Sequence, residues 1–201
     1  MGGAGPPARE AEHSPQAERG AQRPQCIGAV TGLRRTYRRA CTDVAARMRL
    51  PAWEHLRYPL RTPLGDHTVA DLLDRLVVGH LSVVDAVGGA APLRSELPER
   101  PTDAVIEAVR AALRALPAGE VPPSATDTVR VAAAEAVVLG WDLQQAILAG
   151  ADPDPILVAD VLPWVWTGAV TLWPGLPHAE EPPDADAVDR LLAAAGRRPS
   201  R

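Results

Sequence analysis

A carboxylate stands inside a long apolar helical run of this chain. From Val129 to Trp141 only Arg130 and Glu135 are polar. An unpaired carboxylate is costly to bury, so a helix that carries one usually supplies it with a cation, a proton or a solvent-filled cleft. The group that faces Glu135 is therefore the most direct indication of a functional site.

Two further side chains have the chemistry of general acids or bases. His80 lies near the middle of the apolar stripe of a predicted helix, where it is a core histidine, a general acid or base in the bundle cavity, or a metal ligand together with Glu135. Asp142 follows Glu135 by two helical turns. It either bonds a neighbouring loop or adds a second carboxylate to the cavity, where the like charge would raise one pKa. Trp141 either packs or stacks on a substrate.

The helical period of the apolar residues predicts an all-α bundle of four main helices and no strand. Thr68 and Asp71 form a predicted capping box, Gly88-Gly89 ends that helix, and Thr102 is expected to cap the next one. Gly150 is expected to end the long helix, and Pro163 to kink the following one. The expected helices cover about residues 27–48, 68–87, 102–116, 125–148, 152–172 (starting at Asp152 or Asp154) and 184–195.

Composition predicts one domain over residues 26–201, preceded by a disordered tail over residues 1–25. A Pro-rich connector follows the first helix over residues 51–65. The net charge of −4 gives no case for nucleic acid as a partner, and no apolar run is long enough for a membrane span. With no signal peptide and no disulfide framework, a cytoplasmic protein is expected, in which Cys41 is a buried structural thiol.

Three segments resemble the mycothiol-dependent maleylpyruvate isomerase family, part of the DinB-like helical-bundle superfamily. Residues 135–143, EAVVLGWDL, are similar to its E-x-x-x-H-G-W-D-L helix, with Leu139 at the His position. Residues 62–73, TPLGDHTVADLL, are similar to T-P-C-x-x-W-T-V-x-D-L-L, with His67 at the Trp position. Residues 186–199 are similar to the tail D-x-x-D-R-L-L-x-x-x-G-R-x-P. The resemblance implies a DinB-like four-helix bundle with a short C-terminal helix. The chain lacks Lys, Asn and Phe and is rich in Ala, Arg and Pro, a bias that suits an actinobacterial genome.

The resemblance also implies that the family's metal site is degenerate here. In the family, a Glu and a His one helical turn apart share a divalent metal with a His of an earlier helix. The corresponding positions hold Glu135, Leu139 and Arg75, and neither Leu nor Arg can bind a metal. Arg75 would instead place a guanidinium where the metal sits. We therefore predict an Arg75–Glu135 salt bridge.

Three functions remain open on this basis. The first is a metal-independent protein that binds or transforms a small organic molecule, with Glu135, His80 and Asp142 as catalytic groups and with Arg75, Trp141 and Leu139 as substrate-binding groups. As an enzyme it would be an isomerase, lyase or transferase that uses acid–base chemistry. The second is a family enzyme with mycothiol and a divalent metal as cofactors. The third is a non-catalytic bundle that binds a partner.

Two further features of the sequence remain without an assigned function. A basic cluster in the first helix is either a solvated face or a binding site for an anion or partner. It consists of Arg34, Arg35, Arg38 and Arg39. Trp164, Trp166 and Trp173 are predicted to belong to the core, and with residues 174–178 they also offer a contact for a homodimer.

Overall fold

The computed structural model describes residues 1–2, 29–50, 67–147, 152–173, 177–181 and 184–197. The predicted all-α class is confirmed, because the elements of these residues are all helices. They are α1 (Ala29–Arg47), α2 (Val69–Ala86), η2 (Arg94–Glu96), α3 (Pro101–Ala115), η3 (Pro123–Ala125), α4 (Thr126–Ala146), α5 (Pro155–Trp166) and α6 (Ala187–Ala194). No helix among the described residues is long and apolar enough to cross a membrane.

Several predicted features lie outside the described residues. They are the disordered tail beyond Gly2, the connector over residues 51–65 and the helix end at Gly150.

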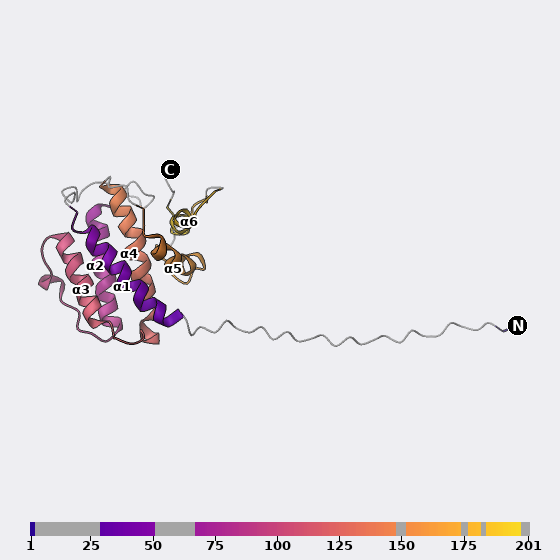
Figure 1. Ribbon diagram of the computed structural model, residues 1–201, viewed down its shortest axis with the longest axis horizontal. Coiled ribbons are helices and arrows are strands. Elements are labelled where there is room, and N and C mark those ends of the chain that lie inside the picture. The colour runs from indigo at the N-terminus through magenta and orange to yellow at the C-terminus, as the bar shows by residue number, and fades with distance from the viewer. Residues whose placement is uncertain (3–28, 51–66, 148–151, 174–176, 182–183, 198–201) are drawn as a thin grey trace.

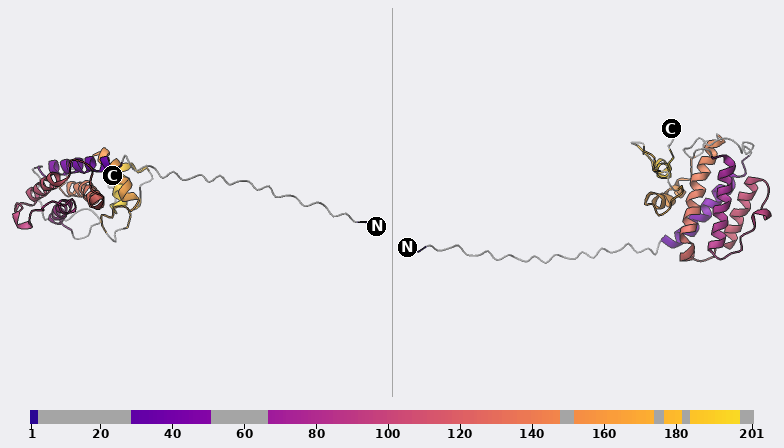
Figure 2. Two further views of the ribbon diagram at one scale, coloured as in Figure 1. Left: turned by 90° about the horizontal axis from the view of Figure 1, so that it is seen from below. Right: turned by 180° about the vertical axis from the view of Figure 1, so that it is seen from behind.

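The helices α1 to α4 pack side by side, and α5 and α6 lie together beside α4 (Figure 1). Within this bundle α2 packs against α3 and α4, while α1 packs against α4. The view from behind in Figure 2 shows α2, α3 and α4 as neighbours. Helix α4 therefore has partners on several sides, which makes it the central element of the fold.

The burial of α4 follows from this central position. Every residue from Ala132 to Gln144 is buried, including Glu135 and Asp142. A helix that is apolar all round belongs in the core, where each of its faces meets another element. Two carboxylates on such a helix are costly to bury unless the packing leaves an opening to water or supplies a cation.

The predicted capping box of α2 is confirmed. The Thr68 hydroxyl accepts a hydrogen bond from the Asp71 backbone N–H at 3.3 Å, and the Asp71 carboxylate accepts one from the Thr68 backbone N–H at 2.6 Å. This pairing satisfies two of the free N–H groups at the helix start. It determines where α2 begins, and α2 ends before Gly88-Gly89 as predicted.

Two of the helix boundaries that differ from the prediction have a clear local cause. Helix α3 begins at Pro101, whose fixed φ suits the first helical position, so Thr102 is not its cap but a buried residue inside the first turn. Helix α5 begins after its predicted cap Asp154 but ends at Trp166 instead of residue 172. Gly168 has a φ of +72°, a left-handed conformation that ends the helix and turns the chain back toward α4.

The early end of α5 also changes the environment of the tryptophans. Trp164 and Trp173 are partly buried and pack against the core as predicted. The prediction is wrong for Trp166, whose side chain is 50% exposed. It lies in the last turn of α5, and its ring stacks on the exposed His178 with 6.2 Å between the ring centroids.

The capping box provides a test of the α2 boundary. Replacing Thr68 by Ala removes the side-chain acceptor, and we expect the free energy of unfolding to fall by about 1 kcal/mol in urea titrations. Ser82→Ala is the matched control, because Ser82 lies on the exposed face of the same helix and bonds only the Val78 carbonyl. An equal loss in both variants would contradict the role of the capping box.

Candidate functional site

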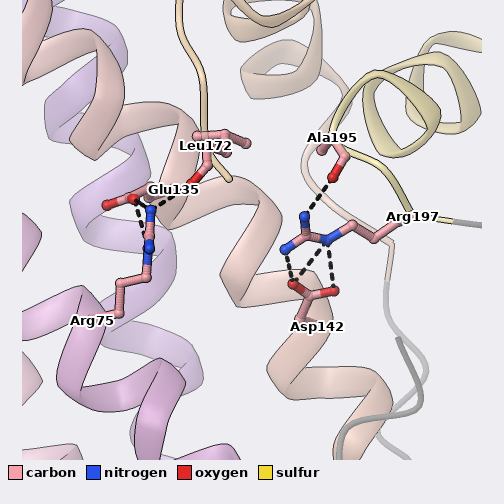
Figure 3. Close-up of polar contacts among 6 residues, drawn as sticks. All are labelled: Arg75, Glu135, Asp142, Leu172, Ala195 and Arg197. Carbon is pink, nitrogen blue, oxygen red and sulfur yellow. Dashed lines mark hydrogen bonds and ion pairs between the residues drawn. The ribbon is translucent and has the colours of Figure 1, made fainter. Parts of the chain in front are cut away.

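The predicted salt bridge between Arg75 and Glu135 is confirmed. Arg75 of α2 donates from Nε and Nη2 to Glu135 Oε1 of α4, at 2.8 and 2.5 Å (Figure 3). The Glu135 side chain is 6% exposed and the Arg75 side chain 34% exposed. The guanidinium thus neutralises an interior carboxylate from the more solvent-exposed side of the contact between the two helices.

The loop after α5 completes the surroundings of this guanidinium. Arg75 Nη2 donates to the Leu172 carbonyl at 2.5 Å, and its Cζ lies 3.8 Å from the centroid of the Trp173 ring. A cation above an indole ring gains electrostatic attraction, and more so where water is excluded. Arg75 is therefore held by a carboxylate, a carbonyl and an aromatic face at the same time, which determines its position closely.

Only one oxygen of Glu135 is engaged by the arginine. Both hydrogen bonds go to Oε1, and no hydrogen bond from the described residues reaches Oε2. Oε2 lies over Gly79 of α2, where an added Cβ would be 2.9 Å away. Burial raises the pKa of Glu135, and the charge and hydrogen bonds of Arg75 oppose part of that rise. The site therefore presents one bound oxygen and one open oxygen of the same carboxylate.

A groove of about 510 Å³ opens onto this oxygen between α2 and α4. Arg75, Gly79 and Glu135 lie along it, and its remaining lining mixes apolar, hydroxyl-bearing and acidic side chains. These are Val78, Val131 and Ala132, then Ser82 and Thr128, and finally Asp127. Its size is in the range of small-molecule sites, and it combines apolar walls with polar groups from both helices.

Asp142 does not lie in this groove. It binds Arg197, which donates from Nη2 and Nε to Asp142 Oδ2 at 2.7 and 3.2 Å, and both side chains are fully buried. Figure 3 shows this pair apart from Arg75 and Glu135 along α4. Burial raises the pKa of Asp142 and Arg197 opposes the rise, so no neighbouring carboxylate is the cause. The structure thus agrees with the interpretation of Asp142 as a residue that bonds a neighbouring segment.

The turn after α6 is what brings Arg197 inside. Gly196 has a φ of +76°, and the backbone N–H of Arg197 donates to the Leu192 carbonyl at 2.7 Å. This left-handed turn directs the arginine toward α4, where Nη1 also donates to the Ala195 carbonyl at 2.5 Å. Arg197 Cζ lies 5.2 Å from the Trp173 centroid. Trp173 therefore contacts both arginines that neutralise the carboxylates of α4.

His80 belongs to a buried polar cluster apart from the groove. Its Nδ1 is 2.8 Å from the Tyr37 hydroxyl of α1, and its Nε2 is buried with no hydrogen-bond partner among the described residues. Burial lowers the pKa of His80 to about 4 and raises the pKa of Tyr37, so the tyrosine donates to a neutral imidazole. Cys41 is buried beside Tyr37, and burial raises its pKa to about 12, as expected of a structural thiol.

The structure therefore brings together two of the six predicted site residues, Arg75 and Glu135. Leu139 and Trp141 are buried in α4 and do not line the groove. Sequence reasoning missed Gly79, Trp173 and Arg197. Gly79 carries a signal that was available, since a glycine inside an apolar helix face often marks a close approach. Arg197 lies in the tail motif, but nothing in the motif names its partner.

The donors around Glu135 do not fit a divalent metal. Oε1 already accepts from a permanently charged guanidinium, and Leu139 has no donor atom. The Nδ1 atom of His80 is taken by Tyr37. Over the described ranges, no three His, Cys, Asp or Glu side chains come close enough to share a metal ion. These donor atoms suit an arginine side chain, and not a metal ion, as the cation beside Glu135.

Comparison with protein-family models, with curated proteins and with solved structures found no match for this chain.

The buried pair of Asp142 and Arg197 makes a prediction for stability. Arg197→Met leaves a carboxylate uncompensated in the core, which typically lowers the free energy of unfolding by about 3–5 kcal/mol. The double variant Asp142→Asn/Arg197→Met removes the stranded charge, so it should lose less than Arg197→Met alone. Chemical denaturation measures both. A double variant as unstable as the single one would show that the arginine acts through packing alone.

The buried imidazole makes a prediction for pH dependence. An unfolded histidine has a pKa of about 6.5, whereas His80 in the folded protein has a pKa of about 4. The unfolded chain therefore binds a proton first, and stability is lost as the pH falls from about 6.5 through 4, at up to about 1.4 kcal/mol per pH unit. His80→Gln should remove this contribution, while His178→Gln at an exposed site should keep it. Equal pH profiles of the free energy of unfolding for wild type and His80→Gln would contradict the assignment.

Proposed function

We propose that this protein binds a small polar organic molecule in the α2–α4 groove without a metal. One observation carries the proposal. The two oxygens of a buried carboxylate are divided, with Oε1 bound to Arg75 and Oε2 open to a groove of about 510 Å³. Oε2 accepts no hydrogen bond from the described residues and faces the groove, so it can accept a hydrogen bond from a bound molecule. The open oxygen thus supports a site for a ligand.

The groups that face the groove indicate the chemistry of the ligand. Glu135 Oε2 accepts a hydrogen bond, and Arg75 Nη1 has no hydrogen-bond partner among the described residues and remains able to donate. Val78, Val131 and Ala132 supply apolar contact next to them. A molecule with a donor and an acceptor at one end and an apolar body matches this arrangement, in which two polar groups set orientation and the walls supply affinity.

The resemblance to the mycothiol-dependent maleylpyruvate isomerase family supports the same proposal. It accounts for a cation beside Glu135 and for the exchange of an ion for Arg75, in a divergent cytoplasmic protein of that kind. If the bound molecule reacts, Glu135 is the group in contact with it, with a pKa raised by burial toward the range of a general acid or base. His80 and Asp142 have other partners and are not part of that chemistry.

The first test is elemental analysis of untagged protein. We expect no stoichiometric zinc, nickel, manganese or iron, because the guanidinium occupies the position of the ion. A thermal-shift screen of small organic compounds then identifies ligands, since a molecule that binds the folded state raises the unfolding temperature. Close to one metal ion per chain would overturn the metal-free proposal.

The second test uses variants of the site with the best compound of the screen. Glu135→Gln and Arg75→Met should each abolish the ligand-induced shift, measured against the variant's own unfolding temperature. Gly79→Ala should abolish it too, because the new Cβ would lie 2.9 Å from Oε2 while every charge is kept. Glu107→Gln and Arg114→Met, an exposed ion pair of α3 outside the groove, are the matched controls. A shift that survives in all three site variants would place the function elsewhere.

A further inference from the structure

A second groove lies between α1 and the loop that follows α3, apart from the α2–α4 groove. It has a volume of about 400 Å³. Arg34, Arg35 and Arg38 line it from α1, and Ala118, Gly119 and Glu120 line it from the loop. None of these residues lines the groove at Glu135. The basic cluster noted in the sequence is thus divided, with three of its four arginines gathered in one hollow.

The three arginines differ from other arginines of the same helix. Arg39 binds Asp154 at 2.6 Å, and Arg47 binds Asp43 at 2.7 Å. Arg34, Arg35 and Arg38 form no ion pair with any residue that the structure describes. The Nε atom of Arg34 is, in addition, buried with no hydrogen-bond partner in the part of the chain that the structure describes. A buried donor without an acceptor is costly, and a bound anion would remove that cost.

The positions along α1 bring the three guanidiniums onto one face. Residues advance by about 100° each around a helix, so Arg38 lies between Arg34 and Arg35, about 40° and 60° from them. Like charges one turn apart destabilise a helix. The helix retains this repulsion, whereas Asp154 at the start of α5 and Asp43 of α1 neutralise Arg39 and Arg47. A loss of stability of this kind is the expected trade-off at an anion site.

We propose that this groove binds a small phosphomonoester that also carries a hydroxyl or amino group. The planar fork of a guanidinium matches phosphate oxygens in geometry, and several of them together match a group of charge about −2. Glu120 repels a phosphate placed next to it, so the phosphate lies on the arginine side. Glu120 then accepts a hydrogen bond from the other end of the ligand. A volume of about 400 Å³ suits a molecule of that class.

Isothermal titration calorimetry of the full chain at low ionic strength tests the proposal. Glycerol 3-phosphate, inorganic phosphate and glycerol are the probes. We expect glycerol 3-phosphate to bind most tightly, inorganic phosphate more weakly, and glycerol not at all. Arg34→Gln and Arg35→Gln should each weaken glycerol 3-phosphate binding about ten-fold, the loss of one charge-assisted contact. Glu120→Gln should remove the preference for glycerol 3-phosphate over inorganic phosphate.

Arg49→Gln is the matched control, because Arg49 is an exposed arginine just after α1 that does not line the groove. It should change the affinity by less than about two-fold, because a guanidinium outside the groove makes no contact with the ligand and acts only through its screened charge. Equal losses in Arg49→Gln and Arg34→Gln would reduce the effect to net charge and overturn the proposal. Failure of both phosphate compounds to bind at millimolar concentration would do the same.

Folding of the variants separates a binding role from a structural one. Arg38→Gln removes a like-charge neighbour, so its unfolding temperature should equal or exceed that of the wild type, while its affinity for glycerol 3-phosphate falls. A variant that is both less stable and still able to bind would show that the cluster serves the fold.

Discussion

Two carboxylates on one buried helix each require a cation, and two other segments of the chain pack against this helix to supply the cations. Glu135 and Asp142 lie two turns apart on α4, where every neighbouring residue is buried. Their cations come from opposite parts of the chain, Arg75 from α2 and Arg197 from the turn after α6. Removal of either cation would leave an interior charge without compensation, which no apolar contact replaces. The two ion pairs thus fix α4 against α2 and against the turn after α6.

Trp173 connects the two ion pairs. Its ring faces Arg75 at 3.8 Å and Arg197 at 5.2 Å, and the preceding carbonyl of Leu172 accepts from Arg75. The segment after α5 therefore serves both carboxylates of α4 through the arginines that neutralise them. Because Gly168 ends α5 early, this segment can return to the bundle. The C-terminal part of the chain therefore helps to hold Arg75 in position at the site.

The two ion pairs differ in one respect that bears on function. Asp142 and Arg197 are fully buried, and both carboxylate oxygens accept from the arginine. Glu135 offers only Oε1 to Arg75 and leaves Oε2 above Gly79 at a groove. The first pair is closed and structural, and the second is open on one side. An interior carboxylate that keeps one oxygen free at a groove is a candidate functional group, whereas a carboxylate bound through both oxygens in the core serves the fold.

The amino-acid sequence by itself determined the helical class, the capping box of α2 and the contact between Arg75 and Glu135. The first two rest on local spacing, whereas the contact between Arg75 and Glu135 joins residues 60 apart and was predicted from the resemblance of two separate segments to family motifs. Tertiary structure alone decided that Asp142 belongs to Arg197 and that His80 belongs to Tyr37. Those partners are 55 and 43 residues apart, and helical period reports which face of a helix is buried but not which helix meets that face. For the same reason, four adjacent arginines read as one cluster in the sequence, and only packing separated Arg39, bound to Asp154, from the three that share a groove.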